Sequence, residues 1–517
     1  MTDFGRRICL GVACLLMVVS ANAQEVVLSS ADGKISLSGT ILDYDGEFYR
    51  LNTAFGEMTL RALGLVCSGR ACPDPGKYAA DLIISGTADA LNDLLPALIE
   101  DFSFSSATNS LRQDQDGAWT LFITDPVQIP VARIQGKPAR AASAIADLTE
   151  EKIDIAIANR TANSREIQAA ARKGAVDLAH DRYRQVLALD AVVFIVSPEN
   201  PISSISRRDL GRVFSGAIRN WAELGGFDAP VVLMERDPST DSNDAFRRAV
   251  FGSRASRPVA PARIFSSADE LASAVVADPF ALGATSFAGI RNAKPLAIRE
   301  ACGISQYPTL FGLQSGDYPL SHAIFLFSPK RRLAIFARNL MAYLRSESGQ
   351  RAVSAAGFAG QNMTDVAFAD QQERIANALR EAGSGVTLAA LRGFVAELSE
   401  ARRLSATYRF VGHSTSLTAR SRRYVTALAR MIEAGDFDGR EIIFAGFSDS
   451  KGSANGNRRV SRQRAVRVAN RVRAAAQRAD LSKIRIQTIG FGEVSPVACN
   501  GSLEGRRLNR RVEVWFR

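Results

Sequence analysis

The sequence has few histidines and lacks a nucleotide-binding loop. Only 3 histidines occur among its 517 residues, and none of them stands in a nucleophile elbow or with the spacing of metal ligands. A Gly-rich loop of the Walker type is also missing from the sequence. We therefore predict that the protein is not an enzyme and binds no cofactor and no metal.

Cysteine is scarce, and the glycine and apolar contents are ordinary. The chain has 6 Cys, no period of three among its 39 Gly, and 46% hydrophobic residues. These values exclude a disulfide-rich miniprotein, a collagen-like chain and intrinsic disorder. The length corresponds to about two to four domains, so a multidomain globular protein remains.

Long apolar runs are absent except at the N-terminus. Two arginines precede the apolar segment Ile8–Val19, and Ala21–Ala23 has the small-x-small pattern that a signal peptidase cuts. Residues 1–23 are therefore predicted to be a signal peptide, with maturation at Gln24. No later stretch reaches the roughly 18 apolar residues of a membrane helix, so we expect an exported mature chain without a transmembrane segment.

Four cysteines remain in the mature chain, in an oxidising compartment. Cys67 and Cys72 are close in sequence and are predicted to form a disulfide that closes a small loop. Cys302 and Cys499 either pair across domains or stay free, and the sequence leaves both alternatives open. Neither pair has the ligand spacing of a zinc site.

Acidic residues are few in the last part of the chain. Residues 401–517 contain 24 basic and 9 acidic side chains, a net charge of +15, whereas residues 24–400 contain 38 and 43. Because export argues against nucleic acid, an anionic wall polymer or a lipid surface is the better partner for the basic part. The alternative is that its 22 arginines reflect composition and are spread over solvated faces.

The hydrophobic pattern divides the mature chain into four segments. Residues 24–76 alternate as strands do and predict a small β-rich cap. Residues 77–365 mix buried strands with amphipathic helices, which indicates an α/β domain. Residues 366–404 are predicted to be a helical linker. Residues 405–517 predict an α+β domain of order β-α-β-α-β-β, with strands at 406–411, 441–447, 484–490 and 511–516 and helices at 419–434 and 458–478.

Two runs in the second segment carry a family resemblance. Residues 190–201 (DAVVFIVSPENP) and 210–226 (LGRVFSGAIRNWAELGG) resemble the periplasmic phosphate-binding proteins of ABC transporters. The resemblance implies a two-lobed clamshell of the type II periplasmic-binding-protein class, with a small anion such as phosphate between the lobes. The chain would cross between the lobes near Leu187–Asp190 and Leu282–Ser286. An ABC permease or an envelope signalling protein is then expected as a partner.

Polar turns after three predicted strands supply the donors that a desolvated oxyanion needs. A helix N-terminus offers free N–H groups and a partial positive charge, and an arginine adds a planar pair of donors. From these turns and the resemblance we predict eight oxyanion-binding residues: Ser85, Gly86, Thr87, Asn159, Arg160, Arg236, Thr240 and Ser242.

The chain departs from this family at two of these turns. Asp241 stands between the two hydroxyl residues where the family usually has Gly, and its charge would repel an anion if it pointed inward. The family's early Gly-Ser turn is replaced by residues 140–143 (RAAS). Asp241 therefore raises the alternative of a ligand with a cationic group.

The last domain carries a second resemblance. Gly446–Gly452 (GFSDSKG), Val460–Ala465 (VSRQRA) and Gly505–Glu513 (GRRLNRRVE) are similar to the OmpA-like C-terminal domain, a family that binds peptidoglycan noncovalently. The resemblance implies that the wall peptide is held by Asp449, Asn457 and Arg464.

Diaminopimelate in that peptide presents an ammonium beside a carboxylate, so its site needs one acid and one base close together. A guanidinium can hold the carboxylate with two hydrogen bonds, and we expect Asp449 and Arg464 to form this pair. The alternative is a plain salt bridge within the domain.

Together these features predict an exported solute-binding protein, for phosphate or another small oxyanion, that is anchored noncovalently to peptidoglycan. Its expected location is the periplasm, associated with peptidoglycan at the inner face of the outer membrane. The rival interpretation is a wall-anchored scaffold or sensor whose clamshell binds a different ligand or a protein.

Overall fold

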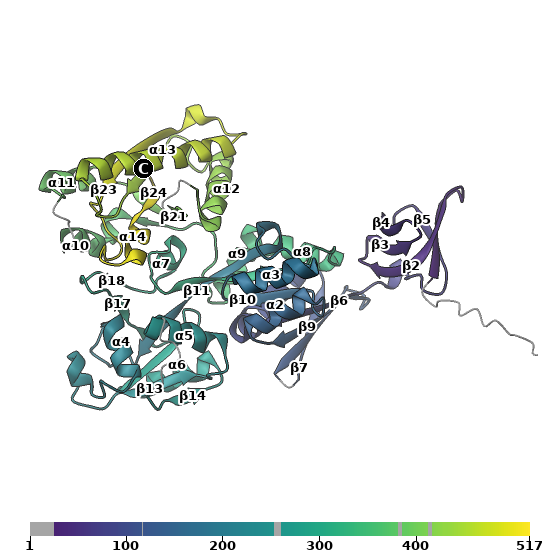
Figure 1. The fold of residues 1–517 in the computed structure, drawn as a ribbon, viewed down its shortest axis with the longest axis horizontal. Helices are drawn as coiled ribbons and strands as arrows, with labels where there is room; N and C mark the ends of the chain where they lie inside the picture. The colour runs from purple at the N-terminus through teal and green to yellow at the C-terminus, as the bar shows by residue number, and fades with distance from the viewer. Residues whose placement is uncertain (1–24, 116, 253–259, 381–384, 412–415) are drawn as a thin grey trace, which may run out of the picture.

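The protein consists of a small N-terminal domain, a two-lobed domain next to it, and a C-terminal domain beside the second lobe (Figure 1). The structure is a computed structural model that describes residues 25–115, 117–252, 260–380, 385–411 and 416–517. The predicted signal peptide, residues 1–23, and the predicted mature terminus Gln24 lie outside these ranges. Within them, no helix has both the length and the apolar character to cross a membrane.

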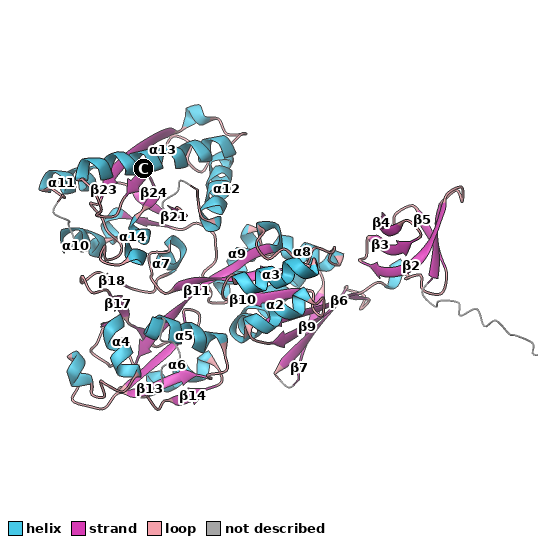
Figure 2. Cartoon of the chain, in the orientation of Figure 1, coloured by secondary structure: helices cyan, strands magenta, loops and turns pink. Residues whose placement is uncertain are grey.

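The N-terminal domain, which we call the cap, is a five-stranded antiparallel sheet (Figure 2). Its strands in spatial order are β4 (Gly56–Arg61), β3 (Phe48–Thr53), β2 (Ser36–Tyr44), β1 (Glu25–Ser30) and β5 (Leu65–Ser68). The period of two in β1 buries Val26 and Leu28 on one face, where they pack with Leu51 of β3. A disulfide joins Cys67 to Cys72, whose Cα atoms are 5.8 Å apart.

Ion pairs around Asp45 fix the cap to the first lobe. The Asp45 carboxylate is 5% exposed and accepts a hydrogen bond from the backbone N–H of Phe48 at 2.7 Å. Arg332 of the first lobe donates from Nε to Asp45 at 2.7 Å, and Arg338 donates to Glu47 at 2.9 Å. The cap is therefore held by charge-assisted hydrogen bonds as well as by the chain connection.

The first lobe contains one end of an 11-stranded sheet. Its strands in order are β19 (Ser321–Phe327), β10 (Ile155–Ala158), β6 (Ala80–Gly86), β9 (Pro130–Pro138), β8 (Ala118–Thr124) and β7 (Asn109–Gln115). Helices α1 (Leu95–Ser105), α8 (Ile335–Tyr343) and α9 (Glu347–Ala355) pack on the face with Ile155 and Ile157. Helices α2 (Ala141–Thr149) and α3 (Ser164–Lys173) pack on the face with Ala156 and Ala158.

The second lobe contains the other end of the same sheet. Its strands are β14 (Arg263–Phe265), β13 (Val232–Arg236) and β15 (Ala281–Ser286), and its main helices are α4 (Arg207–Phe214), α5 (Asp241–Phe251) and α6 (Ala268–Ala277). A three-stranded sheet of β12 (Ser204–Ser206), β17 (Ala297–Arg299) and β18 (Ser305–Gln306) and the helix α7 (Leu310–Ser315) complete it.

One long strand, β11 (Arg184–Val196), belongs to both lobes. Its residues 184–191 pair with β19 in the first lobe, and residues 192–196 pair with β15 in the second. The predicted first crossing at Leu187–Asp190 lies within this strand. The predicted second crossing at Leu282–Ser286 is wrong, because this segment is β15 and stays in the second lobe. The chain returns to the first lobe at β19.

The C-terminal domain is a five-stranded sheet with helices on both faces. The strand order is β20 (Asp365–Ala367), β21 (Arg402–Arg409), β24 (Arg511–Phe516), β22 (Glu441–Phe447) and β23 (Arg485–Gly492). Helices α12 (Ala419–Ala434) and α13 (Ala454–Ala475) cover the face with Ile442 and Phe444. Helices α10 (Gln372–Arg380) and α11 (Leu388–Leu398) cover the face with Ile443 and Trp515, and α14 (Leu503–Asn509) precedes β24.

The segment 366–404, predicted as a linker, is built into this domain. Its start belongs to β20, which pairs with β21 through Asp365 and Leu404. Phe394 and Leu398 of α11 are buried in one apolar cluster with Phe447 of β22. The segment is therefore one layer of the C-terminal domain, because its apolar residues cover a sheet face that would otherwise be open to water.

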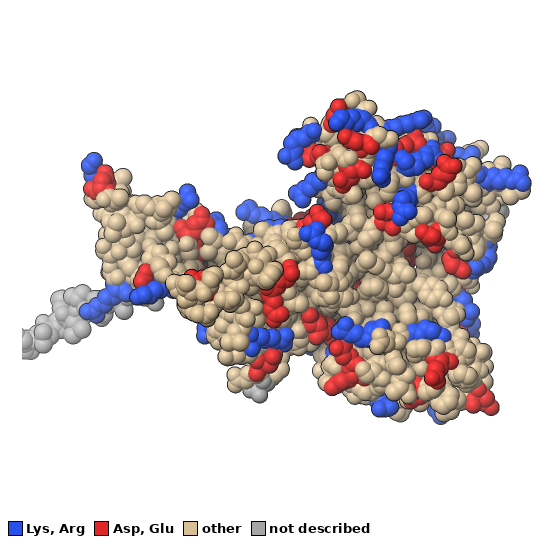
Figure 3. Space-filling model, turned by 180° about the vertical axis from the view of Figure 1, so that it is seen from behind, with Lys and Arg blue, Asp and Glu red and all other residues tan. Residues whose placement is uncertain are grey.

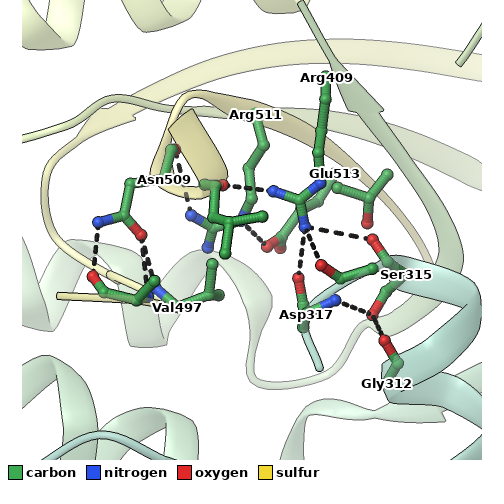
Figure 4. Close-up of polar contacts among 12 residues, drawn as sticks. Gly312, Ser315, Asp317, Arg409, Val497, Asn509, Arg511 and Glu513 are labelled. Atoms are coloured by element: carbon green, nitrogen blue, oxygen red, sulfur yellow. Dashed lines mark hydrogen bonds and ion pairs between the residues drawn. The ribbon is translucent and has the colours of Figure 1, made fainter. Parts of the chain in front are cut away.

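The C-terminal domain is joined to the second lobe by a disulfide and by buried ion pairs. Cys302, which follows β17, is bonded to Cys499, which settles the alternative that the sequence left open. Asp317, after α7, is 6% exposed and lies 2.8 Å from Arg403 and 3.0 Å from Arg409 of β21. Figure 4 shows the Arg409 side chain reaching Asp317 and the backbone around Ser315. The two domains thus share one charged, largely buried interface.

Candidate functional site

A cavity of about 30 Å³ lies between the two lobes, where β6, β11, β13, β15 and β19 meet α5. Its polar lining comes from both lobes: Thr87, Asp89, Asn159, Asp190, Arg236, Ser242, Asn243, Thr285, Ser286 and His322. Four of the eight residues predicted to bind an oxyanion are in this set. The polar turns that follow the strands of the two lobes therefore meet at this one cavity, as expected for a two-lobed binding domain.

The arginine of the cavity is paired with a carboxylate that the sequence analysis did not single out. Arg236, at the end of β13, donates from Nη2 to Oδ1 of Asp89 at 2.8 Å, and the two side chains are only 7% and 11% exposed. The other carboxylate oxygen of Asp89 accepts a hydrogen bond from the hydroxyl of Ser242. Asp89 belongs to the first lobe and its two partners to the second, so this carboxylate bridges the lobes.

Two further predicted residues, Thr87 and Asn159, reach the cavity. Thr87 is 5% exposed and follows β6, and Asn159 follows β10. Oδ1 of Asn159 is buried without a hydrogen-bond partner among the described residues, as is Nε of Arg236. Since buried polar atoms are normally paired, both atoms remain available to a bound group.

The other four predicted residues do not line the cavity. Ser85 donates its hydroxyl to the carbonyl of Lys137 at 2.8 Å inside the sheet. A Cβ atom at Gly86 would lie 2.2 Å from the Ile157 carbonyl oxygen, so this glycine serves close strand packing. These two positions therefore support the sheet from which the turn departs.

Arg160 and Thr240 also serve local structure. Arg160 holds Glu166 in a two-pronged pair at 2.8 and 2.7 Å, beside the capping box that starts α3. Thr240 caps α5, because its hydroxyl oxygen accepts a hydrogen bond from the N–H of Asn243 at 3.2 Å. The sequence located their turns, but it did not show where these side chains point.

Asp241, the departure from the family pattern, bonds to the opposite lobe. Its Oδ2 accepts a hydrogen bond from the N–H of Ala141, the first residue of α2, at 2.8 Å. A helix N-terminus attracts negative charge, so the Asp241 carboxylate occupies an anion position there. Burial raises the pKa of Asp241, and the Ala141 hydrogen bond opposes this shift. The turn at residues 140–143 also contributes to the contact between the lobes, because Arg140 donates to the carbonyl of Ser239 at 2.8 Å and to Asp244.

Asp190 and His322 are cavity residues that sequence reasoning missed as site residues. They are opposite each other in the ladder between β11 and β19. Asp190 accepts hydrogen bonds from the N–H groups of Ala191 and Phe287 at 2.8 Å each, and burial raises its pKa to about 7. Burial lowers the pKa of His322 to about 4. At neutral pH the cavity therefore holds the neutral imidazole of His322 and the carboxyl group of Asp190, which is about half protonated.

The predicted peptidoglycan site lies at the end of β22. Asp449 is 8% exposed and pairs with Arg510, whose Nη1 lies 2.6 Å from Oδ2. The other oxygen of Asp449 accepts from the N–H of Lys451 at 3.2 Å. Arg510, which the sequence analysis passed over inside the motif at 505–513, is thus the direct base partner of Asp449.

Arg464 stands near this pair without bonding to Asp449 in the described part of the chain. Its guanidinium carbon lies 5.5 Å from the centre of the Phe410 ring. Burial and the charge of Arg510 lower the pKa of Arg464, and the charge of Asp449 opposes them. Asn457 is 8% exposed, and its Nδ2 has no partner among the described residues. One acid, two arginines and a free amide donor therefore meet here, which suits a ligand with both an ammonium and a carboxylate.

Among the described residues, no cluster of three or more His, Cys, Asp or Glu side chains has an arrangement that would hold a metal ion.

Two family matches cover most of the two larger domains. Residues 126–348 match the PBP superfamily domain, and residues 409–510 match the OmpA family. The phosphate-binding protein PstS of Borreliella burgdorferi is 25% identical over 211 residues, which are 40% of this chain and 72% of that protein. PstS of Bacillus subtilis is 27% identical over 169 residues, 32% of this chain and 53% of that protein.

Relatives of the C-terminal domain and solved structures give further matches. The peptidoglycan-binding protein ArfA of Mycobacterium tuberculosis is 42% identical over 73 residues, 14% of this chain and 21% of that protein. The crystal structure of an ABC-type phosphate transport receptor from Vibrio cholerae is 20% identical with a TM-score of 0.40, and covers 54% of this chain and 98% of that one. Both predicted family resemblances and the predicted fold class are confirmed. The chain thus combines a two-lobed domain, whose residues 126–348 match the PBP superfamily domain, with a C-terminal domain, whose residues 409–510 match the OmpA family.

Proposed function

We propose that this protein is an exported solute-binding protein that binds a small oxyanion such as phosphate between its lobes and is held noncovalently to peptidoglycan by its C-terminal domain. The observation that carries this proposal is the convergence of Arg236, Ser242, Thr87 and Asn159 from two lobes on one cavity. Its volume of about 30 Å³ is far below the roughly 300–1,000 Å³ of pockets for organic ligands. A small inorganic ion therefore suits it better than a sugar or an amino acid.

The cavity also contains hydrogen-bond acceptors, which favour an anion that still carries a proton. Oδ1 of Asn159 and Oδ1 of Asn243 are buried without partners in the described chain. Hydrogen phosphate can donate a hydrogen bond to such an acceptor, whereas sulfate has no proton to donate. We therefore expect phosphate to be preferred over sulfate.

Calorimetric titration of the mature protein with phosphate and sulfate tests the cleft. Phosphate should release or absorb heat, and Arg236→Ala should weaken its binding by about 2–5 kcal/mol, because a buried anion then loses its charged partner. The absence of heat and of thermal stabilisation with phosphate, sulfate and their analogues would contradict the assignment. That result would favour the rival function of a wall-anchored scaffold or sensor, which the pairing of Asp89 with Arg236 also supports.

The C-terminal domain is proposed to bind the diaminopimelate stem peptide through Asp449, with Arg510 and Arg464 beside it. With this anchoring we expect the protein in the periplasm, at the inner face of the outer membrane, with an ABC permease or an envelope signalling protein as its partner. Basic side chains of this domain, blue in Figure 3 and interspersed there with acidic ones, outnumber the acidic side chains in residues 401–517 and add attraction to an anionic wall but no selectivity.

Cosedimentation of the mature protein with purified sacculi tests this second part. Asp449→Asn should abolish pelleting, while Asp436→Asn, a matched change at an exposed carboxylate of the same domain, should pellet like the wild type. Each variant is first checked for folding by circular dichroism. If Asp449→Asn still pellets at low and moderate salt, the site is elsewhere. If all binding disappears with salt and neither variant matters, the positive surface alone is responsible.

A further inference from the structure

The donors expected to hold an anion already hold a carboxylate of the chain. Asp89 accepts hydrogen bonds from Arg236 at 2.8 Å and from the Ser242 hydroxyl, one on each oxygen. The ion pair is nearly enclosed, with side-chain exposures of 7% for Arg236 and 11% for Asp89. The two oxygens of this carboxylate accept from the same pair of donors that two oxygens of a tetrahedral oxyanion such as phosphate would use.

Two other interlobe contacts repeat this arrangement. The Asp241 carboxylate of the second lobe accepts from the first N–H of α2 in the first lobe at 2.8 Å. Arg140 of the first lobe pairs with Asp244 of the second. Three carboxylates therefore hold cationic or N–H groups of the opposite lobe, and the Asp89 pair is the most deeply buried of these contacts.

We propose that Asp89 is a built-in competitor for the anion, which holds Arg236 and Ser242 and keeps the lobes together until an incoming oxyanion displaces it. This inference rests on the proposed function of the cleft. Displacement requires the Asp89 carboxylate to leave its buried pair and be hydrated again, while the anion takes over both donors. The side chain of Asp89 thus sets the affinity of the site and selects for anions that carry more charge or more acceptor atoms than one carboxylate.

Removal of the Asp89 charge isolates this competition. Asp89→Asn keeps the size of the side chain but leaves the Arg236 guanidinium without an ionic partner, so that an anion no longer has to displace a charge. A matched control is Asp81→Asn on β6 of the same lobe, where the carboxylate pairs with Arg133 at the surface and is 54% exposed. Asp89→Ala serves as a second variant if the asparagine side chain disturbs folding.

The experiment is isothermal titration of inorganic phosphate into the wild type and these variants, together with small-angle scattering before and after phosphate is added. Asp89→Asn is expected to bind phosphate about tenfold or more tightly than the wild type, and Asp81→Asn is expected to match the wild type. Asp89→Asn should also have a larger radius of gyration than the wild type before titration and contract with phosphate. Addition of Arg236→Ala to Asp89→Asn should remove the gain.

The outcomes separate this inference from the proposed function. If the wild type binds phosphate and Asp89→Asn and Asp89→Ala bind it equally or more weakly, Asp89 is no competitor, whereas the oxyanion function stands. If neither the wild type nor any folded Asp89 variant binds phosphate, both the competitor and the oxyanion function are refuted. Tighter binding without any change in scattering would overturn the claim that Asp89 keeps the lobes together.

Discussion

Glu513 is the residue whose loss should weaken the C-terminal domain most clearly. Its carboxylate is fully buried on β24 and accepts hydrogen bonds from Arg511 at 2.7 Å and from the Trp515 indole at 3.1 Å. Arg374 and Arg403 lie 2.9 and 3.2 Å from it. Figure 4 shows the Glu513 carboxylate beside the Arg511 guanidinium. Removal of this charge leaves three arginines in the interior with too few anions.

The pKa shift of Glu513 and the cost of breaking a buried ion pair indicate the same loss of stability for Glu513→Gln. Burial alone would raise the pKa of Glu513, but the charges of Arg374, Arg403 and Arg511 outweigh it and lower the pKa from 4.5 to about 2. At about 1.4 kcal/mol for each pKa unit, this shift corresponds to about 3 kcal/mol of stability. Removal of one partner from a buried ion pair costs about 3–5 kcal/mol. We therefore expect Glu513→Gln to lower the free energy of unfolding by about 3 kcal/mol.

Urea unfolding followed by tryptophan fluorescence measures this loss, since Trp515 contacts Glu513 directly. Glu504→Gln is the control, because Glu504 is 67% exposed and lies 3.7 Å from its partner Arg507. It should change the free energy of unfolding by less than about 0.5 kcal/mol.

The pH dependence gives a second readout of the same carboxylate. Because its pKa is lower in the folded state, its contribution to stability is complete above pH 4.5 and is lost as the pH falls towards 2. Glu513→Gln should therefore lose less stability over this range than the wild type. A loss below about 1 kcal/mol at pH 7, or an unchanged slope between pH 4.5 and 2, would refute the argument.

Two further predictions concern Asp190 and the disulfide between domains. The folded-state pKa of Asp190 is raised from 3.8 to about 7, so the wild type should lose up to about 4 kcal/mol of stability as the pH rises through this range. Asp190→Asn should abolish that slope in thermal unfolding measured at several pH values, and an identical slope in both proteins would contradict the burial argument. Replacement of Cys302 and Cys499 by Ser removes a covalent bond between residues that are 197 positions apart. Because the unfolded chain then gains conformational entropy, the free energy of unfolding should fall by up to about 5 kcal/mol. An unchanged denaturation midpoint would show that the unfolded chain gains no freedom when this bond is lost.

The sequence predicted the C-terminal elements well because their signals are local. Helix α12 and strands β22 and β24 have the predicted bounds, and α13 begins four residues earlier, where Ser453 caps it. The 366–404 segment was misjudged for a different reason. Its helices are amphipathic, but the surface that they cover is formed by strands about 50 to 150 residues further along the chain. A short-range sequence pattern cannot indicate a packing partner that is so far along the chain.

The site residues of the cleft were also predicted only in part, because their contacts come from residues that are distant in sequence. The pattern of strand, polar turn and helix located the turns at 85–87, 159–160 and 236–242, because each signal spans only a few residues. The orientation of each side chain depends on the opposite lobe. Asp89 is 147 positions from Arg236, and nothing near Asp89 in sequence distinguishes it from an ordinary residue at a helix start. Its contact with Arg236 depends on the packing of the two lobes against each other.

The bond between Cys302 and Cys499 decides how a mechanical load would travel through the molecule. The backbone route from the C-terminal domain to the clamshell passes through β20 and enters the first lobe by way of α9. The disulfide offers a second covalent route, from the loop after β23 straight into the second lobe. A pull on the C-terminal domain is therefore shared between both halves of the clamshell, and reduction of this one bond would leave the second lobe held to that domain by noncovalent contacts alone.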